Sequence, residues 1–167
     1  DNYQTISSVI INNTSTGSRT VLSYRANKEQ MKAFNLDFEP DVILIDGHEY
    51  ERSNEVLDRY PNAISIIDAG RATDEVINLA KKVNYVVCSK EFAESVTGIN
   101  IDYENEETIL KLYRELENKF KGIIVVTLES KGSLYKYNDN IGIMDAIEVK
   151  AIDTKFVKDT AKFIKKY

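Results

Sequence analysis

The chain has 167 residues, of which 43% are hydrophobic and 29% are charged, and its formal net charge is −5. This length suits one folded domain that needs no metal or disulfide to stabilise its core. An acidic chain without a basic stripe is a poor partner for nucleic acid. No apolar run approaches the roughly 20 residues that span a bilayer, so we expect no membrane partner and a cytoplasmic location.

The N-terminal residues 5–25 predict a β-hairpin. Thr5–Asn12 and Arg19–Tyr24 are rich in β-branched residues, and the segment between them has turn chemistry. Four short apolar runs follow, each closed by small or polar residues. They are Val42–Ile45, Ile64–Ile67, Tyr85–Cys88 and Ile123–Val126. Continuous apolar runs of this length are typical of parallel strands buried on both faces. Cys88, the only cysteine, is expected to be a small buried side chain.

Helical patterns separate the later runs. Thr73 and Asn105 can cap two helices whose apolar residues recur at helical spacing, and a shorter helix is predicted from Ser89 to Val96, ended by Gly98. Alternating strands and helices with right-handed crossovers predict a doubly wound sheet. Short strands return after Gly132, with a hairpin over residues 133–144 and a candidate third strand over residues 147–152.

Ligands of open α/β sheets bind outside the carboxyl ends of the strands. This rule nominates the small and polar residues just after the four apolar runs, each of which has a loop or cap role as its alternative. They are Asp46, Gly47, His48, Asp68, Gly70, Arg71, Ser89, Lys90, Glu91, Thr127, Glu129, Lys131 and Gly132. Neither a dinucleotide-binding fingerprint nor a P-loop is present. His48, the single histidine, cannot build a His-rich metal site.

The strongest local signal is the stretch from Val125 to Ser133. A buried strand ends in Thr127, and a tight turn with Gly132 follows. Backbone N–H groups and the Thr127 hydroxyl could meet phosphate oxygens there, with Lys131 adding positive charge. The C-terminal lysines read either as the solvated face of an amphipathic helix, which we favour, or as a site for an anionic partner. They are Lys155, Lys158, Lys162, Lys165 and Lys166.

Taken in order, these pieces resemble the PfkB (ribokinase-like) family of carbohydrate kinases, from about Thr5 to Thr154. Six segments resemble the family's G-x-R-T hairpin, its next core strand, its D-x-N/G-x-R segment, its E-x-L-T-G helix, its T-L-G-x-x-G-S turn and the approach to its catalytic loop. In the same order, these segments are Gly17–Thr20, Asp41–Gly47, Ile67–Arg71, Ser89–Gly98, Thr127–Ser133 and Lys150–Thr154.

The resemblance implies a fold, an activity and a set of site residues. The implied fold is a ribokinase-like three-layer α/β sandwich with a mostly parallel sheet, plus the N-terminal hairpin. The implied activity is ATP-dependent phosphorylation of a sugar hydroxyl, with ATP and Mg²⁺ as cofactors and a monovalent cation as a further candidate. Sugar and nucleotide are the implied partners, and a homodimer is a candidate assembly. The implied site residues are Ser89, Thr127, Glu129, Lys131 and Gly132 for the nucleotide, Asp153 for the metal and Asp159 as catalytic base.

The chain also departs from the family pattern. The family continues D-T-x-G-A-G-D, whereas Phe156, Val157 and Lys158 precede Asp159 here, so Asp159 is either the base or a coincidence of spacing, and we favour the coincidence. Glu129 replaces a glycine of the turn, the family's N-x-x-E is not reproduced at Ser89 and Phe92, and the sugar pocket's glycine pair is missing. We therefore expect this chain, a central portion of such a kinase, to be inactive alone. The alternative is a non-catalytic, degenerate kinase-like module that binds sugar or nucleotide.

Overall fold

The computed structural model describes residues 7–13, 15–16, 18–24 and 35–147. The chain divides into two compact units, one formed by Asp1–Met31 with Ile147–Tyr167 and the other by Lys32–Ala146. In the first unit, β1 (Ser7–Asn12) and β2 (Arg19–Tyr24) form an antiparallel hairpin in which Ser7 faces Tyr24 and Asn12 faces Arg19. The predicted N-terminal hairpin is therefore confirmed.

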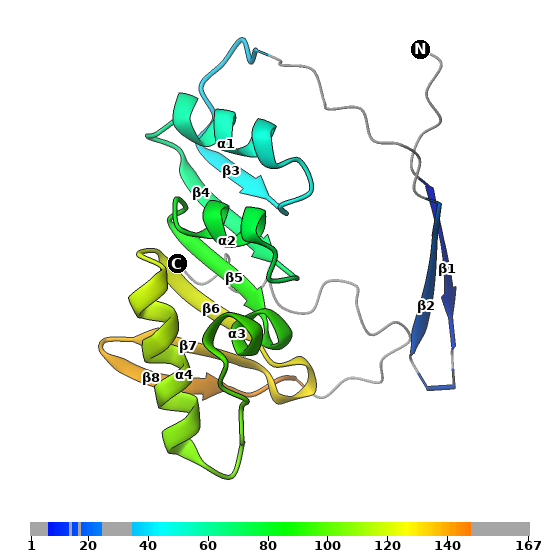
Figure 1. The fold of residues 1–167 in the computed structure, drawn as a ribbon, viewed down its shortest axis with the longest axis vertical. Helices are drawn as coiled ribbons and strands as arrows, with labels where there is room; N and C mark the ends of the chain where they lie inside the picture. Colours follow the sequence, from blue (N-terminus) through cyan, green and yellow to red (C-terminus); the bar gives the residue numbers. More distant parts are fainter. Residues whose placement is uncertain (1–6, 14, 17, 25–34, 148–167) are drawn as a thin grey trace. The chain divides into compact units, whose positions relative to one another are not determined.

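The second unit contains a six-stranded sheet whose strands lie in chain order (Figure 1). The strands are β3 (Val42–Ile45), β4 (Ile64–Ala69), β5 (Tyr85–Ser89), β6 (Ile123–Thr127), β7 (Ser133–Tyr137) and β8 (Asn140–Met144). The first four are parallel, whereas β7 and β8 are antiparallel to their neighbours. The mixed, mostly parallel sheet and the separate hairpin confirm the predicted fold class.

Four helices accompany this sheet: α1 (Tyr50–Arg59), α2 (Asp74–Ala80), α3 (Lys90–Thr97) and α4 (Glu106–Lys119). Three begin at the caps that the sequence predicts, because the side chains of Thr73, Ser89 and Asn105 each accept a backbone N–H of the first turn. Gly98 ends α3 in the left-handed conformation, also as predicted. Helix α1 was not predicted from the sequence.

The main hydrophobic cluster lies on one face of the sheet, although Ile66, Val87 and Val125 are buried on the other face. The strand residues of this cluster lie opposite one another on neighbouring strands, and all four helices pack on the same face (Figure 1). The central members are Ile45, Ile67, Val86, Ile124, Leu57, Leu79, Phe92 and Leu116. Within the described ranges the strand order never reverses and no helix covers the opposite face. The described strands thus follow one another in chain order, without the reversal that a doubly wound sheet would have.

Two titratable side chains are buried in this core, and burial raises the pKa of both. Cys88 is 1% exposed, and burial raises the pKa of its thiol to about 12, so it is an inert packing residue, as predicted. The hydroxyl of Tyr113 donates a 2.8 Å hydrogen bond to the carbonyl of Ile124 and so ties α4 to β6. Burial raises the pKa of Tyr113 as well.

Two further predictions can be checked only as far as the described residues allow. Apart from Ile147, the candidate strand at 147–152 lies outside them. Among the helices of the described ranges, none combines the length and the apolar character that crossing a membrane requires.

Candidate functional site at the carboxyl edge of the sheet

The polar residues that follow the parallel strands share one edge of the sheet. Ile45 faces Ile67, Ala69 faces Cys88, and Ser89 faces Thr127 in the parallel register. Asp46, Asp68, Ser89 and Thr127 therefore lie along the same edge, at the ends of four neighbouring strands. This confirms the prediction that the four apolar runs deliver their polar residues to one place, where sheets of this class bind ligands.

Ser89 and Thr127 lie at the centre of this edge, and both hydroxyls hold the strands together. The Ser89 hydroxyl donates to the carbonyl of Gly70 at 3.0 Å and accepts the N–H of Phe92 at 3.0 Å. The Thr127 hydroxyl donates to the carbonyl of Cys88 at 3.3 Å. Ser89 thus already uses its donor and accepts a cap hydrogen bond, whereas Thr127 keeps its acceptor lone pairs for a ligand donor.

The turn between β6 and β7 contains a short 3₁₀ helix, Glu129–Lys131. Three backbone N–H groups of this turn are bonded inside it: that of Leu128 to the Gly132 carbonyl, that of Lys131 to the Leu128 carbonyl, and that of Gly132 to the Glu129 carbonyl. The turn therefore offers fewer free backbone donors than its sequence predicts. Its remaining attraction for an anion is the exposed Lys131 side chain.

Gly132 has a structural reason to be glycine. Its φ is +96°, and a Cβ there would lie 1.9 Å from the carbonyl oxygen of Met144 and 2.8 Å from the nitrogen of Ala146. The space beside Gly132 is thus filled by the chain's own backbone after β8. Contact between Gly132 and a nucleotide stays a prediction.

Glu129 stands at a position whose backbone favours glycine. Its φ is +53°, in the left-handed region that costs an ordinary residue about 1–2 kcal/mol. Its side chain is exposed. The departure from the family's T-L-G pattern thus adds both backbone strain and a carboxylate to the turn.

Two carboxylates lie at the β3–β4 end of the edge. Partial loss of hydration, and then the Asp46 carboxylate nearby, raise the pKa of Asp68. The backbone N–H of His48 donates to Asp46 at 3.0 Å, and the His48 Nε2 lies 4.0 Å from the other Asp46 carboxylate oxygen. His48 thus lies in the loop after β3 and is tied to Asp46 by its backbone N–H; a hydrogen-bonding role for its imidazole stays a prediction.

A magnesium ion fits this edge only if the phosphates of a bound substrate complete its coordination shell. The described residues contain no cluster of three or more His, Cys, Asp or Glu side chains that could hold a metal ion. Kinase-type Mg²⁺ needs only one or two carboxylates, because substrate phosphates complete its shell. Asp153, the predicted metal residue, and Asp159, the predicted base, lie outside the described residues.

An aromatic side chain that the sequence did not single out joins the site. The Lys90 ammonium lies 4.9 Å from the centre of the Tyr103 ring, and the Lys131 ammonium lies 5.6 Å from it. Lys90 begins α3, and Lys131 belongs to the turn after β6. Tyr103 lies in the loop between α3 and α4, so only the folded chain brings the three together.

Comparison with solved structures places this fold among kinases. A candidate ribokinase from Agrobacterium tumefaciens is 21% identical with a TM-score of 0.67, over 87% of this chain and 48% of that one. Thermotoga maritima ribokinase is 22% identical with a TM-score of 0.55, over 86% and 48%. A microbiome-derived acarbose kinase is 12% identical with a TM-score of 0.57, over 91% and 51%. The chain thus spans about half the length of these structures.

A family-level match agrees with the structural comparison. No curated protein sequence matches the chain significantly. The sequence model described as pfkB family carbohydrate kinase matches residues 4–155, which include Asp153 and stop short of Asp159. The match covers most of the chain and all the residues of the carboxyl edge. The chain therefore belongs to the PfkB family of carbohydrate kinases.

Proposed function

We propose that this chain supplies the nucleotide-binding side of an ATP-dependent kinase that phosphorylates a sugar hydroxyl. The observation that carries the proposal is the shared edge, where Ser89, Thr127 and the turn to Gly132 lie side by side at the ends of β5 and β6. This is where ligands of α/β sheets bind. The family match and the ribokinase-like fold support the same activity.

The chemistry of phosphoryl transfer suits such an edge. Catalysis consists mainly of positioning and of stabilising negative charge on the phosphates, so the protein needs oriented donors and cations. In our proposal Lys131 contacts the phosphates, and the Thr127 hydroxyl joins it by turning its proton from the Cys88 carbonyl to a phosphate oxygen. Ser89 fixes the start of α3 beside them. Bound Mg²⁺ would add positive charge next to the transferred phosphoryl group, with Asp153 as its protein ligand. Asp159 is the candidate base for the sugar hydroxyl.

A second candidate function is a non-catalytic nucleotide- or sugar-binding module. Glu129 favours it, because a carboxylate and a strained backbone occupy the place of the family's glycine. Phe156, Val157 and Lys158 favour it too, because bulky side chains replace the small residues of the anion hole. The kinase and a nucleotide-binding module both require nucleotide binding at the same turn, whereas a module that binds only sugar does not, so nucleotide binding is the first property to test.

Substituting Glu129→Gly is expected to tighten ATP binding by about fivefold or more, because the change removes a carboxylate near the phosphates, and the repulsion at surface dielectric is about 1–4 kcal/mol. It should also raise the free energy of unfolding by about 1 kcal/mol, since glycine tolerates the positive φ. Lys131→Ala should weaken ATP binding. Titration calorimetry measures both affinities, and thermal unfolding measures the stability.

Asp139→Gly is the matched control. Asp139 also has a positive φ, of +65°, and also carries a carboxylate, but it lies in the β7–β8 turn at the opposite edge of the sheet. This variant should change stability without changing ATP affinity. If neither Glu129→Gly nor Lys131→Ala alters the affinity for ATP, the turn is purely structural and the proposed nucleotide site is wrong.

A further inference from the structure

Two lysines from different elements meet on one aromatic ring. Both ammonium groups lie inside the range of about 6 Å at which a ring attracts a cation. The ring belongs to Tyr103, which is half-buried and packs against the hydrophobic core. A ring anchored in this way limits where the two flexible lysine side chains can place their charges.

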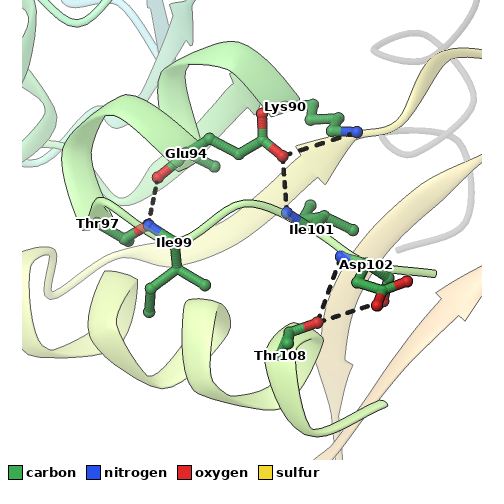
Figure 2. Close-up of polar contacts among 8 residues, drawn as sticks. Lys90, Glu94, Thr97, Ile99, Ile101, Asp102 and Thr108 are labelled. Carbon is green, nitrogen blue, oxygen red and sulfur yellow. Dashed lines mark hydrogen bonds and ion pairs between the residues drawn. The ribbon is translucent and has the colours of Figure 1, made fainter. Parts of the chain in front are cut away.

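The loop that carries Tyr103 is braced on both sides (Figure 2). Before Tyr103, the Glu94 carboxylate accepts the N–H of Ile101 at 2.7 Å, and the Thr97 hydroxyl accepts the N–H of Ile99 at 3.2 Å. From the other flanking helix, the Thr108 hydroxyl on α4 accepts the N–H of Asp102, the residue just before Tyr103, at 3.3 Å and donates to the Asp102 carbonyl at 3.2 Å. The backbone that leads into Tyr103 is thus held by side chains of both flanking helices.

The charges around the ring are only partly balanced. Lys90 has a carboxylate partner, because its ammonium lies 3.7 Å from Glu94 (Figure 2). Lys131 forms no ion pair with any residue in the described part of the chain. Two cations held at one ring repel each other, and a bound anion that touches both would relieve the repulsion. Each ammonium keeps donors for such a ligand, since it carries three.

The position of the pair says which anion fits. Lys90 follows Ser89 at the end of β5, and Lys131 follows Thr127 after β6, so both side chains start from the two neighbouring strands that centre the carboxyl edge. A single phosphate group has three or four oxygens to share between the two ammonium groups. A chain of two or three phosphates can contact two separated cations at once.

We propose that Lys90 and Lys131 form a clamp for the polyphosphate of a nucleoside di- or triphosphate, and that Tyr103 is the positioning residue that holds both lysines. This inference rests on the proposed nucleotide-binding function and deepens it. It adds Lys90 as a phosphate-contacting residue, and it assigns to Tyr103 a role that acts only through the lysines.

Inorganic tripolyphosphate, ATP and AMP are the probes, each titrated into the 167-residue chain and followed by NMR. Tyr103→Leu removes the ring's attraction for cations and should weaken tripolyphosphate and ATP binding by about fivefold. The same variant should leave AMP binding unchanged. Tyr103→Phe keeps the aromatic ring and should bind all three ligands as the unchanged chain does. Lys90→Gln should weaken tripolyphosphate binding, whereas Lys111→Ala, on the exposed side of α4, should not.

The outcomes separate the clamp from the proposed function. Tripolyphosphate that fails to bind the unchanged chain, or that binds Tyr103→Leu and Lys90→Gln undiminished, overturns the clamp even if AMP and ATP bind. Tripolyphosphate binding that needs the aromatic ring supports the clamp; if ATP then binds no more tightly than tripolyphosphate, the nucleotide function fails instead. Should Tyr103→Leu fail to fold, Lys90→Gln decides the question: undiminished tripolyphosphate binding by that variant overturns the clamp.

Discussion

Replacing Gly132 by alanine is expected to destabilise the chain by more than about 3 kcal/mol, which corresponds to a fall in the melting temperature of roughly 6–12 °C or more. Two causes act together. The backbone there has a φ of +96°, and the new Cβ would lie 1.9 Å from the Met144 carbonyl oxygen. Because that neighbour is backbone, no side-chain rotation relieves the clash. Thermal unfolding followed by circular dichroism measures the effect.

Gly142→Ala is the matched control for this prediction. Gly142 lies in β8, close in sequence to the backbone that Gly132 approaches, but a Cβ there meets no atom within 4 Å. This variant should melt within a few degrees of the unchanged chain. If the Gly132→Ala variant melted at the same temperature as the unchanged chain, the close approach of residues 144–146 would not be what requires glycine at position 132.

The chain by itself should not phosphorylate a sugar at a measurable rate. Loss of one oxyanion-type donor typically lowers kcat by about 10²–10³, and Phe156, Val157 and Lys158 stand where the family has its anion hole. Loss of substrate positioning removes further orders of magnitude. The chain spans only 48% of the ribokinase from Thermotoga maritima. A coupled assay for ADP release with a panel of sugars should therefore stay at background.

Rapid ADP release that needs both ATP and a sugar would contradict this expectation. If Asp159→Asn then abolished the release while Asp139→Asn, at the opposite edge of the sheet, left it unchanged, Asp159 would be the catalytic base. In that case its spacing from Asp153 would not be a coincidence.

Local sequence signals predicted the framework well. Helices α2, α3 and α4 begin at Thr73, Ser89 and Asn105 because a short polar side chain at each position satisfies a free backbone N–H. The parallel strands followed from apolar runs of four residues. The carboxyl edge followed in turn, because parallel strands necessarily deliver their ends to the same side.

Helix α1 escaped prediction for a physical reason. It begins after Glu49, whose side chain makes no cap hydrogen bond, and it buries only Ser53 and Leu57. The helix is stabilised instead by ion pairs on its surface, in which the Glu55 carboxylate contacts both Arg52 and Arg59, each about one turn away. Such a helix lacks a capping signal at its start, and its core-facing side has only Tyr50, Val56 and Leu57 as apolar residues among charged ones, so its sequence resembles a polar loop.

The site was predictable in position but not in detail. Ser89, Thr127 and Lys131 could be placed at the edge from chain order alone. The ring of Tyr103 could not, because its contacts with Lys90 and Lys131 join elements far apart in the sequence. The same holds for Gly132, since the backbone that excludes a side chain there comes from the end of β8.

The most direct test of the account is a titration of the isotope-labelled chain with ATP and Mg²⁺, read as changes in backbone amide chemical shifts. Saturable changes are expected at Ser89, Lys90, Thr127 and Lys131 of the carboxyl edge, and none in the β7–β8 turn at Asp139. Changes confined to the opposite edge of the sheet, or no change at millimolar ATP, would contradict the claim that this edge binds the nucleotide.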